Sequence, residues 1–409
     1  LIAGPSASIW RHSSQTPYYL MNVRTKKIKA LAHDSAHLRN VKLSPDGTMV
    51  GYVRNHNIYV MNISSGVETA LTDDGTENIL NGEFDWVYEE EFGLADAWRW
   101  SPDSKKIAFW KFDQTAVKEF NLVDETFLYN KISKLKYPKV GGQNATIKIG
   151  VVDLKKQKTK WMDLGKNGDI YIPRIFWTNS SSSMAMVRLN REQNHLDMLM
   201  ANTRTGRTKT IISDDDPCYV DVQHDISFLR HKDEIVFSSE SSGYRHAYIY
   251  DYSGKLLQQV TKGDWEVTEI VGVDETESWL YFYGKKDSPL EQNIYRVGLD
   301  GNDLTRISPQ AGWHTPLFSP DYKYFIDTYS NVTTPSITVL NNTEGSLIRV
   351  LDEGRIEALT GRNIVYPQFK KVMTDDGIEL NAYLIKPHNF DSNKKYPVLV
   401  YGYGGPGAQ

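Results

Sequence analysis

The sequence predicts a mainly β protein: a β-propeller over residues 1–357, followed by the first strands of an α/β domain over residues 358–409. Three observations lead to this prediction. Short runs of alternating apolar and polar residues fill the chain, one turn phrase recurs between them, and the repeating pattern stops near residue 357. With 409 residues the chain is long for a single core, which favours a domain built from repeats.

Runs rich in β-branched and aromatic residues predict antiparallel strands. Each run is bounded by Gly, Asp, Asn or Ser, the residues that tight turns prefer. Helical periodicity is nearly absent, so few helices are expected. The clearest runs begin at Met49, Asn57, Lys106, Glu234, Ala247, Trp279 and Asn293.

A short turn phrase recurs between predicted strands. It reads LSPDG at 43–47, WSPDSK at 100–105, FWTNSS at 176–181 and FSPDYK at 318–323. With the turns DYSGK and GLDGN after outer strands, it predicts a strand-and-turn cycle that repeats about every 50 residues. This cycle favours propeller blades over the alternative, a large irregular β-sandwich.

The pattern changes after residue 357. The segment that begins at Phe369, FKKVMTDDGIELNAYLIKP, predicts a hairpin, and the apolar run at 397–401, PVLVY, predicts a buried strand. Glycine-rich residues follow this run, as they do where a central strand of an α/β sheet reaches the edge that carries an active site. The segment is therefore predicted to begin a second domain.

Charge and cysteine content argue against several classes of protein. Lys+Arg 47 and Asp+Glu 51 give a formal net charge of −4, which indicates neither a nucleic-acid partner nor a polybasic membrane surface. No run of 18 apolar residues occurs, so a membrane anchor is expected only outside this chain. Cys218 is the single cysteine, which excludes an intramolecular disulfide. No metal ion or cofactor is predicted.

Three consecutive glutamates provide the strongest local signal. They lie in Asp85-Trp86-Val87-Tyr88-Glu89-Glu90-Glu91-Phe92-Gly93. Asp85 is a suitable N-cap and Gly93 a suitable C-cap, so the segment predicts a short helix inserted between strands. Adjacent carboxylates repel one another unless a cation compensates them, so the run indicates either a cation-binding site or a solvated acidic helix face, and the residues alone leave both open.

The phrase D-W-V-Y-E-E-E at 85–91 resembles the dipeptidyl peptidase IV family. The resemblance implies that Glu90 and Glu91 bind the protonated N-terminus of a peptide, while Glu89 and Asp85 support the helix. A peptide α-amino group has a pKa of about 7.7–8.0, so two carboxylates can keep it charged. Peptides with a free N-terminus are the partners that this implies.

Two further phrases match the same family. Ile9-Trp10-Arg11-His12-Ser13 implies that Arg11 reaches into the same pocket and contacts the carbonyl between the first two substrate residues. YGYGGPG near the end implies that the Tyr403 hydroxyl donates to the oxyanion, with Tyr401 as a second candidate. The family's further aromatic and arginine would fall near 219–222, where the match is unclear, so that subsite stays unassigned.

The resemblance covers nearly all of the chain. It implies a serine exopeptidase that releases N-terminal dipeptides and prefers Pro or Ala as the second residue of the substrate. It also implies an eight-bladed propeller lacking at least one N-terminal blade here, and an α/β-hydrolase domain continuing past Gln409. No G-x-S-x-G phrase occurs, so the serine, aspartate and histidine are expected outside this chain. Relatives are commonly dimeric and exported to the periplasm, cell surface or medium; a cytoplasmic location stays open.

Three alternatives to this function remain open. A sister subfamily would prefer a different second residue, and the pocket that separates it lies downstream. An inactive homologue would keep the propeller as a binding subunit and lack the serine. A plain propeller interaction module would not need the glycine-rich strand that contains Tyr403.

Overall fold

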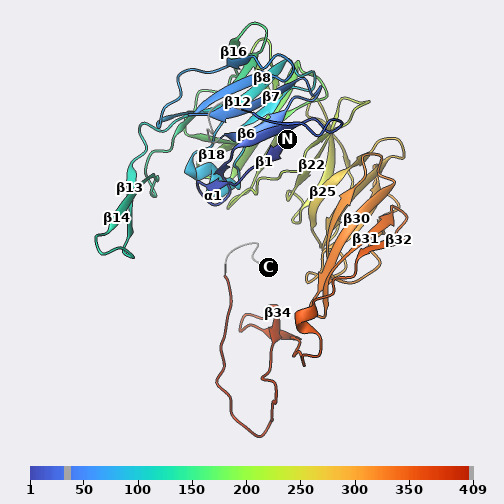
Figure 1. The fold of residues 1–409 in the computed structure, drawn as a ribbon. Helices are drawn as coiled ribbons and strands as arrows, with labels where there is room; N and C mark the ends of the chain where they lie inside the picture. The colour runs from blue at the N-terminus through green and yellow to red at the C-terminus, as the bar shows by residue number, and fades with distance from the viewer. Residues whose placement is uncertain (32–37, 405–409) are drawn as a thin grey trace. The chain divides into compact units, whose positions relative to one another are not determined.

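The computed structural model describes residues 1–31 and 38–404. These residues form seven sheets of three to five strands, three two-stranded sheets, one α-helix and one 3₁₀ helix (Figure 1). The strand content and the succession of four-stranded sheets confirm the predicted β-propeller. By contacts the chain divides into two units, residues 1–286 with 295–305, and residues 287–294 with 306–409.

Consecutive strands pair antiparallel within the propeller sheets, as the short connecting turns require. In the first unit, the early sheets comprise β1 (Ile2–Ala3), β4 (Tyr18–Met21) and β5 (Ile28–Ala30); the small pair β2 (Ala7–Ser8) and β3 (Ser14–Gln15); β6 (Arg39–Leu43), β7 (Met49–Arg54), β8 (Asn57–Asn62) and β9 (Glu68–Ala70); and β10 (Ile79–Asn81), β11 (Trp98–Trp100), β12 (Lys106–Asp113), β15 (Thr146–Asp153) and β16 (Lys158–Trp161).

The later sheets repeat the same four-strand order. They comprise β17 (Ile170–Trp177), β18 (Ser183–Asn190), β19 (His195–Asn202) and β20 (Thr208–Asp215); β21 (Ser227–Phe228), β22 (Glu234–Ser239), β23 (His246–Asp251) and β24 (Leu256–Gln259); β25 (Val267–Asp274), β26 (Trp279–Gly284), β27 (Asn293–Gly298) and β28 (Thr305–Arg306); and β29 (Trp313–Phe318), β30 (Tyr324–Asn331), β31 (Thr334–Asn342) and β32 (Leu347–Asp352). All seven runs predicted as strands lie in these sheets.

The recurring S-P-D phrase forms the turn between the first two strands of a sheet. The Ser44 hydroxyl donates to Asp46 Oδ1 at 2.6 Å and accepts from the Met49 N–H at 2.9 Å. These two bonds close the turn and start the next strand, which explains why the residue types recur. The same pair of bonds recurs at Ser101 with Asp103 and Lys106, and at Ser319 with Asp321 and Tyr324.

The buried apolar residues of the first unit form four clusters, and the largest extends across several sheets. One buried apolar cluster includes Trp110 from β12, Ile172 from β17, Met186 from β18 and Phe237 from β22. The first strand, β17, is buried over most of its length, whereas the last strand, β20, is largely exposed. In a propeller the buried first strand of each sheet lies nearest the central channel.

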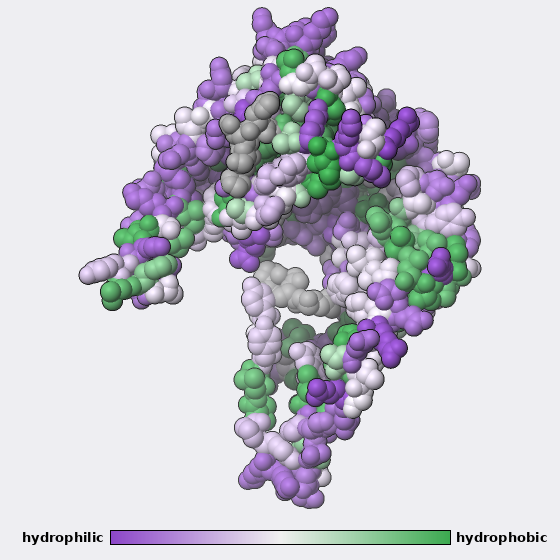
Figure 2. Space-filling view, viewed as in Figure 1, coloured by the Kyte–Doolittle hydropathy of each residue, from purple (hydrophilic) through white to green (hydrophobic). Residues whose placement is uncertain are grey.

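Two insertions depart from the repeat in the sheet that contains β12. The helix α1 (Trp86–Phe92) lies between β10 and β11, as predicted. A hairpin of β13 (Glu119–Asp124) and β14 (Lys131–Lys136) projects away from its sheet, and nothing in the sequence analysis predicted it (Figure 1). Its apolar side chains are exposed (Figure 2), among them Leu122, Val123, Leu128 and Ile132.

The C-terminal segment confirms one prediction and contradicts another. A short 3₁₀ helix (Glu357–Leu359) precedes the predicted hairpin, which forms from β33 (Gln368–Met373) and β34 (Glu379–Leu384). The predicted buried strand at 397–401 is wrong for this structure, because these residues form no strand and their side chains are exposed. Within the described residues no neighbouring strand offers the hydrogen bonds that such a strand needs. The domain boundary at 357/358 stays a prediction.

Candidate functional site

The helix α1 forms because its sequence carries both of its caps. The Asp85 side chain accepts a hydrogen bond from the Tyr88 N–H at 3.0 Å, which satisfies a free donor of the first turn. Gly93 ends the helix in the left-handed region at φ 63°, and its N–H donates to the Tyr88 carbonyl. Both caps were predicted from the residue types.

Burial changes the protonation of the N-cap. Asp85 is 5% exposed, and desolvation raises the pKa of its carboxyl to about 6, although the hydrogen bond from Tyr88 acts in the opposite direction. Between pH 3.8, the ordinary value, and about pH 6, the folded state therefore binds more protons than the unfolded state. The contribution of Asp85 to the free energy of unfolding falls as the pH rises through this window.

We expect the substitution Asp85→Asn to remove this pH dependence while it keeps the cap, since Asn caps helices about as well as Asp. Relative to the variant, the wild type should lose on the order of 1–3 kcal/mol of stability between pH 4 and pH 7. Urea unfolding of both proteins at several pH values measures the difference. Parallel pH profiles would contradict a raised pKa at Asp85.

The buried face of α1 fixes the helix against the sheets. Val87, Tyr88 and Phe92 are buried, and the Tyr88 hydroxyl accepts a hydrogen bond from the Ile172 N–H at 2.7 Å. The Tyr88 ring stacks on Phe84 at 5.6 Å between centroids. With this face held, the carboxylates on the remaining turn are presented from a rigid base.

Glu89 joins α1 to the N-terminal segment. Its side chain is fully buried, and Oε1 accepts hydrogen bonds from the backbone N–H groups of His12 at 2.6 Å and Ser13 at 2.8 Å. Hydrogen bonds to a buried carboxylate are strong, and losing them would leave a charge without partners. The supporting role of Glu89 in a substrate site stays a prediction.

The contact at Glu89 brings Arg11 beside Glu90. Arg11 Nε donates to Glu90 Oε2 at 2.9 Å, and the two side chains are 69% and 20% exposed. An ion pair that is open to solvent contributes little to the free energy of unfolding, so this pair is not needed to stabilise the fold. Two residues that the sequence analysis placed in one site, 79 positions apart in the chain, therefore meet.

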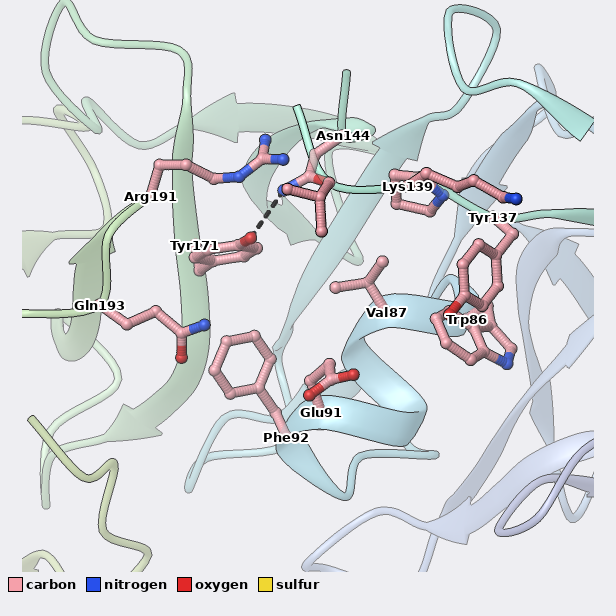
Figure 3. A pocket seen from close by; sticks show the side chains of 12 residues that line it. Trp86, Val87, Glu91, Phe92, Tyr137, Lys139, Asn144, Tyr171, Arg191 and Gln193 are labelled. Atoms are coloured by element: carbon pink, nitrogen blue, oxygen red, sulfur yellow. Dashed lines mark hydrogen bonds between the residues drawn. The ribbon is translucent and has the colours of Figure 1, made fainter. Parts of the chain in front are cut away.

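Glu91 points into a neighbouring pocket of about 660 Å³ (Figure 3). Aromatic rings form much of its wall, and Trp86 packs on Tyr137 with centroids 4.3 Å apart. On the opposite side, Asn144 donates to the Tyr171 hydroxyl at 2.8 Å. The remaining lining residues are Val87, Phe92, Pro138, Lys139, Val140, Arg191 and Gln193.

The residues that line this pocket, apart from Glu91, were not predicted from the sequence as parts of a site. Tyr137 and Asn144 follow the unpredicted hairpin, and Tyr171 and Arg191 come from the next sheet, so no local pattern connects them with Glu91. The Tyr-Pro-Lys phrase at 137–139 was the one signal that could have indicated an ordered loop here.

Tyr219 is a second residue that was left unassigned. Its side chain is half exposed. Burial is the main cause that raises the pKa of its hydroxyl, and the charges of Asp221 and Glu91 add to the effect. Tyr219 therefore lies within electrostatic reach of Glu91.

Tyr403 lies in the second unit, in the exposed segment that follows the C-terminal hairpin. Its side chain is 75% exposed, and that of Tyr401 is 86% exposed. Of the glycine-rich turn, Gly405 and Pro406 lie outside the described residues. The oxyanion role of Tyr403 stays a prediction.

Two kinds of feature are absent from residues 1–31 and 38–404. No group of three or more His, Cys, Asp or Glu side chains is arranged to hold a metal ion. No helix there has the length and apolar character to cross a membrane.

The chain is similar to several known proteins. It is 28% identical to "Dipeptidyl peptidase 4" of Trichophyton tonsurans, over 98% of this chain and 54% of that protein. It is 30% identical to "Probable dipeptidyl-aminopeptidase B" of Aspergillus fumigatus, over 98% and 47%. The crystal structure of Porphyromonas gingivalis dipeptidyl peptidase 4 matches with a TM-score of 0.91 and 32% identity, over 97% of this chain and 57% of that one.

The chain spans about half the length of the curated relatives it matches. The profile of one family, described as the dipeptidyl peptidase IV (DPP IV) N-terminal region, matches residues 1–336. This match covers most of the propeller sheets, including α1 and the segment that carries Arg11. The chain therefore belongs to the dipeptidyl peptidase IV N-terminal region family.

Proposed function

We propose that the intact protein is a serine exopeptidase that releases dipeptides from the N-termini of peptides. The observation that carries this proposal is the junction at α1, where Glu90 and Glu91 lie on one rigid helix and Arg11 reaches Glu90. The similarity to proteins named dipeptidyl peptidase and dipeptidyl-aminopeptidase supports the same activity.

The two carboxylates suit a peptide's charged amino end. A protonated amine offers three donors, and Glu90 and Glu91 can accept from it by charge-assisted hydrogen bonds. Arg11 neutralises part of the negative charge and can donate to the first substrate carbonyl. A blocked N-terminus or an internal peptide segment has no cation to place there, so cleavage would be confined to chain ends.

The chemical step in this proposal uses a serine from outside this chain. A histidine accepts the serine proton as the serine oxygen attacks the carbonyl carbon after the second residue. Tyr403 and a backbone N–H donate to the resulting oxyanion. The amine leaves with a proton from the histidine, and water then hydrolyses the acyl-enzyme.

We further propose a preference for Pro, or Ala, as the second substrate residue. A small pocket outside this chain would set it. The direct test is hydrolysis by the full-length protein of Gly-Pro, Gly-Ala and Gly-Leu anilides, together with N-acetyl-Gly-Pro anilide. We expect Gly-Pro to be released fastest and the acetylated substrate to remain uncleaved. Equal cleavage of free and acetylated Gly-Pro anilides would contradict it.

Export and a homodimer complete the proposal. The exposed apolar side chains on the β13–β14 hairpin support a second copy as a partner, because an isolated hairpin of this kind gains from being covered. Light scattering of the full-length protein tests the dimer, and fractionation of the source cells tests export.

For Arg11→Ala we expect a clear loss of kcat/KM on Gly-Pro anilide, about 10-fold, since one charged hydrogen bond to the substrate is removed. Because the side chain is 69% exposed, the melting temperature should stay unchanged. The exposed Arg24, whose side chain makes no hydrogen bond or ion pair with residues 1–31 or 38–404, provides a matched Arg→Ala control. Unchanged kcat/KM would remove Arg11 from the site.

A further inference from the structure

A second cavity, of about 310 Å³, lies among strands of the first unit. Its lining comes from β17 and β21, which are the first strands of consecutive sheets, together with β11 and β12. Two arginines, Arg99 and Arg174, lie in this lining with His224 and several aromatic rings.

Arg174 carries a buried positive charge in this lining. It is 6% exposed, and its guanidinium donates to the carbonyls of Pro173 at 2.9 Å and Phe92 at 3.3 Å, and to His224 Nε2 at 2.7 Å. Among the residues that the structure describes, its Nε finds no hydrogen-bond partner. All of these partners are neutral, because His224 accepts the bond and burial lowers the pKa of its imidazole.

No carboxylate of the described residues lies within ion-pair distance of Arg174. Asp221 influences it only through its more distant charge. Desolvation lowers the pKa of the guanidinium to about 10, so it still carries its charge at neutral pH. A buried charge without an opposite charge is costly, and such groups are normally paired.

A second cation lies in the same lining. Arg99 is close enough to Arg174 for its charge to lower the pKa of that guanidinium. Arg99 pairs with Asp96 at 2.9 Å, but Asp96 also pairs with Lys42 at 2.6 Å. One carboxylate thus serves two cations, and Arg174 adds a third positive charge.

The rest of the lining is largely apolar. Three indole N–H groups already donate to backbone carbonyls: that of Trp110 to Ile172, that of Trp177 to Arg99 and that of Trp100 to Lys42. The rings therefore present apolar faces to the cavity. A ligand that satisfies this lining combines a negative group with an apolar stem.

We propose that this cavity binds a carboxylate, with the charged group at Arg174 and Arg99 and an apolar stem against the tryptophan rings. A carboxylate matches the planar fork of a guanidinium. The volume lies at the lower end of that of small-molecule sites. A free organic acid and the C-terminus of a short peptide share this chemistry. The site does not depend on the proposed peptidase activity.

The first experiment uses 4-phenylbutyrate as the probe and 4-phenylbutyramide as its uncharged analogue. Calorimetric titration and thermal unfolding of the full-length protein are measured at constant ionic strength. We expect saturable binding and a raised melting temperature with the acid only. A tripeptide ending in Phe, with a free or an amidated C-terminus, distinguishes the peptide source from the free acid. Equal effects of acid and amide, or of the acid and sodium chloride, would overturn the proposal.

The second experiment uses Arg174→Gln and Arg99→Gln. Each should weaken binding of the probe by about 10- to 100-fold, as expected for loss of one charged hydrogen bond. Arg99→Gln leaves the bond from Arg174 to the Phe92 carbonyl in place, so it separates binding from support of α1. The exposed Arg207 provides the matched Arg→Gln control. If Arg174→Gln does not fold, unchanged affinity in Arg99→Gln still overturns the proposal.

Discussion

Replacing Glu90 and Glu91 together by glutamine in the full-length protein is expected to lower kcat/KM for Gly-Pro anilide by about 10²- to 10⁴-fold. Each carboxylate would lose a charge-assisted hydrogen bond to the substrate amine, and a bond of this kind contributes about 1.5–3 kcal/mol. Glutamine keeps the size of the side chain. Glu90 is partly exposed and Glu91 is exposed, so the melting temperature should change little.

The control for this pair removes two charges elsewhere. Glu125 and Glu353 are exposed, and their side chains make no ion pair within the described part of the chain, so their joint replacement by glutamine should leave activity unchanged. The decisive comparison is the ratio of rates on free and N-acetylated Gly-Pro anilide. If the double variant at α1 keeps the wild-type ratio, these carboxylates do not recognise the amino end.

Tyr403→Phe is expected to lower kcat by about 10²- to 10³-fold with little change in KM, because the hydroxyl would donate only to the oxyanion that forms in the transition state. Phenylalanine keeps the aromatic ring, so the substitution removes only the hydroxyl group. Steady-state kinetics on Gly-Pro anilide measure both constants.

Tyr401→Phe is the matched control for this experiment. Both tyrosines lie in the same segment, and both are exposed. We expect full activity in this variant. A loss confined to Tyr401→Phe would transfer the oxyanion role to that residue, and full activity in both variants would remove the segment from the chemical step.

Local chemistry made the helix and the strands predictable. The caps of α1 depend on Asp85 and Gly93 alone, and the blade turns depend on a serine that bonds two residues ahead, as at Ser44 and Asp46. Such contacts join residues that are only a few positions apart in the sequence. The same holds for the hairpin of β33 and β34, whose Asp-Gly turn is local.

Features that depend on distant partners were not predictable in this way. The apolar run at 397–401 has the composition of a strand, yet a strand also needs a neighbour to pair with. The aromatic pocket beside Glu91 combines residues from two sheets and an inserted loop. The meeting of Arg11 and Glu90 was inferred from the family resemblance, because no spacing rule joins positions 79 residues apart.

Glu89 has a consequence for how Arg11 and Glu90, the two halves of the proposed amine site, can move. Its carboxylate accepts from the backbone at His12 and Ser13 while its own backbone belongs to α1. Arg11 precedes His12 in the chain, and Glu90 follows Glu89 in the helix. The hydrogen bonds of Glu89 therefore join the two segments, and Arg11 and Glu90 are expected to move together. If the proposed function holds, a buried carboxylate sets the distance between the two groups that would bind the substrate's amino end.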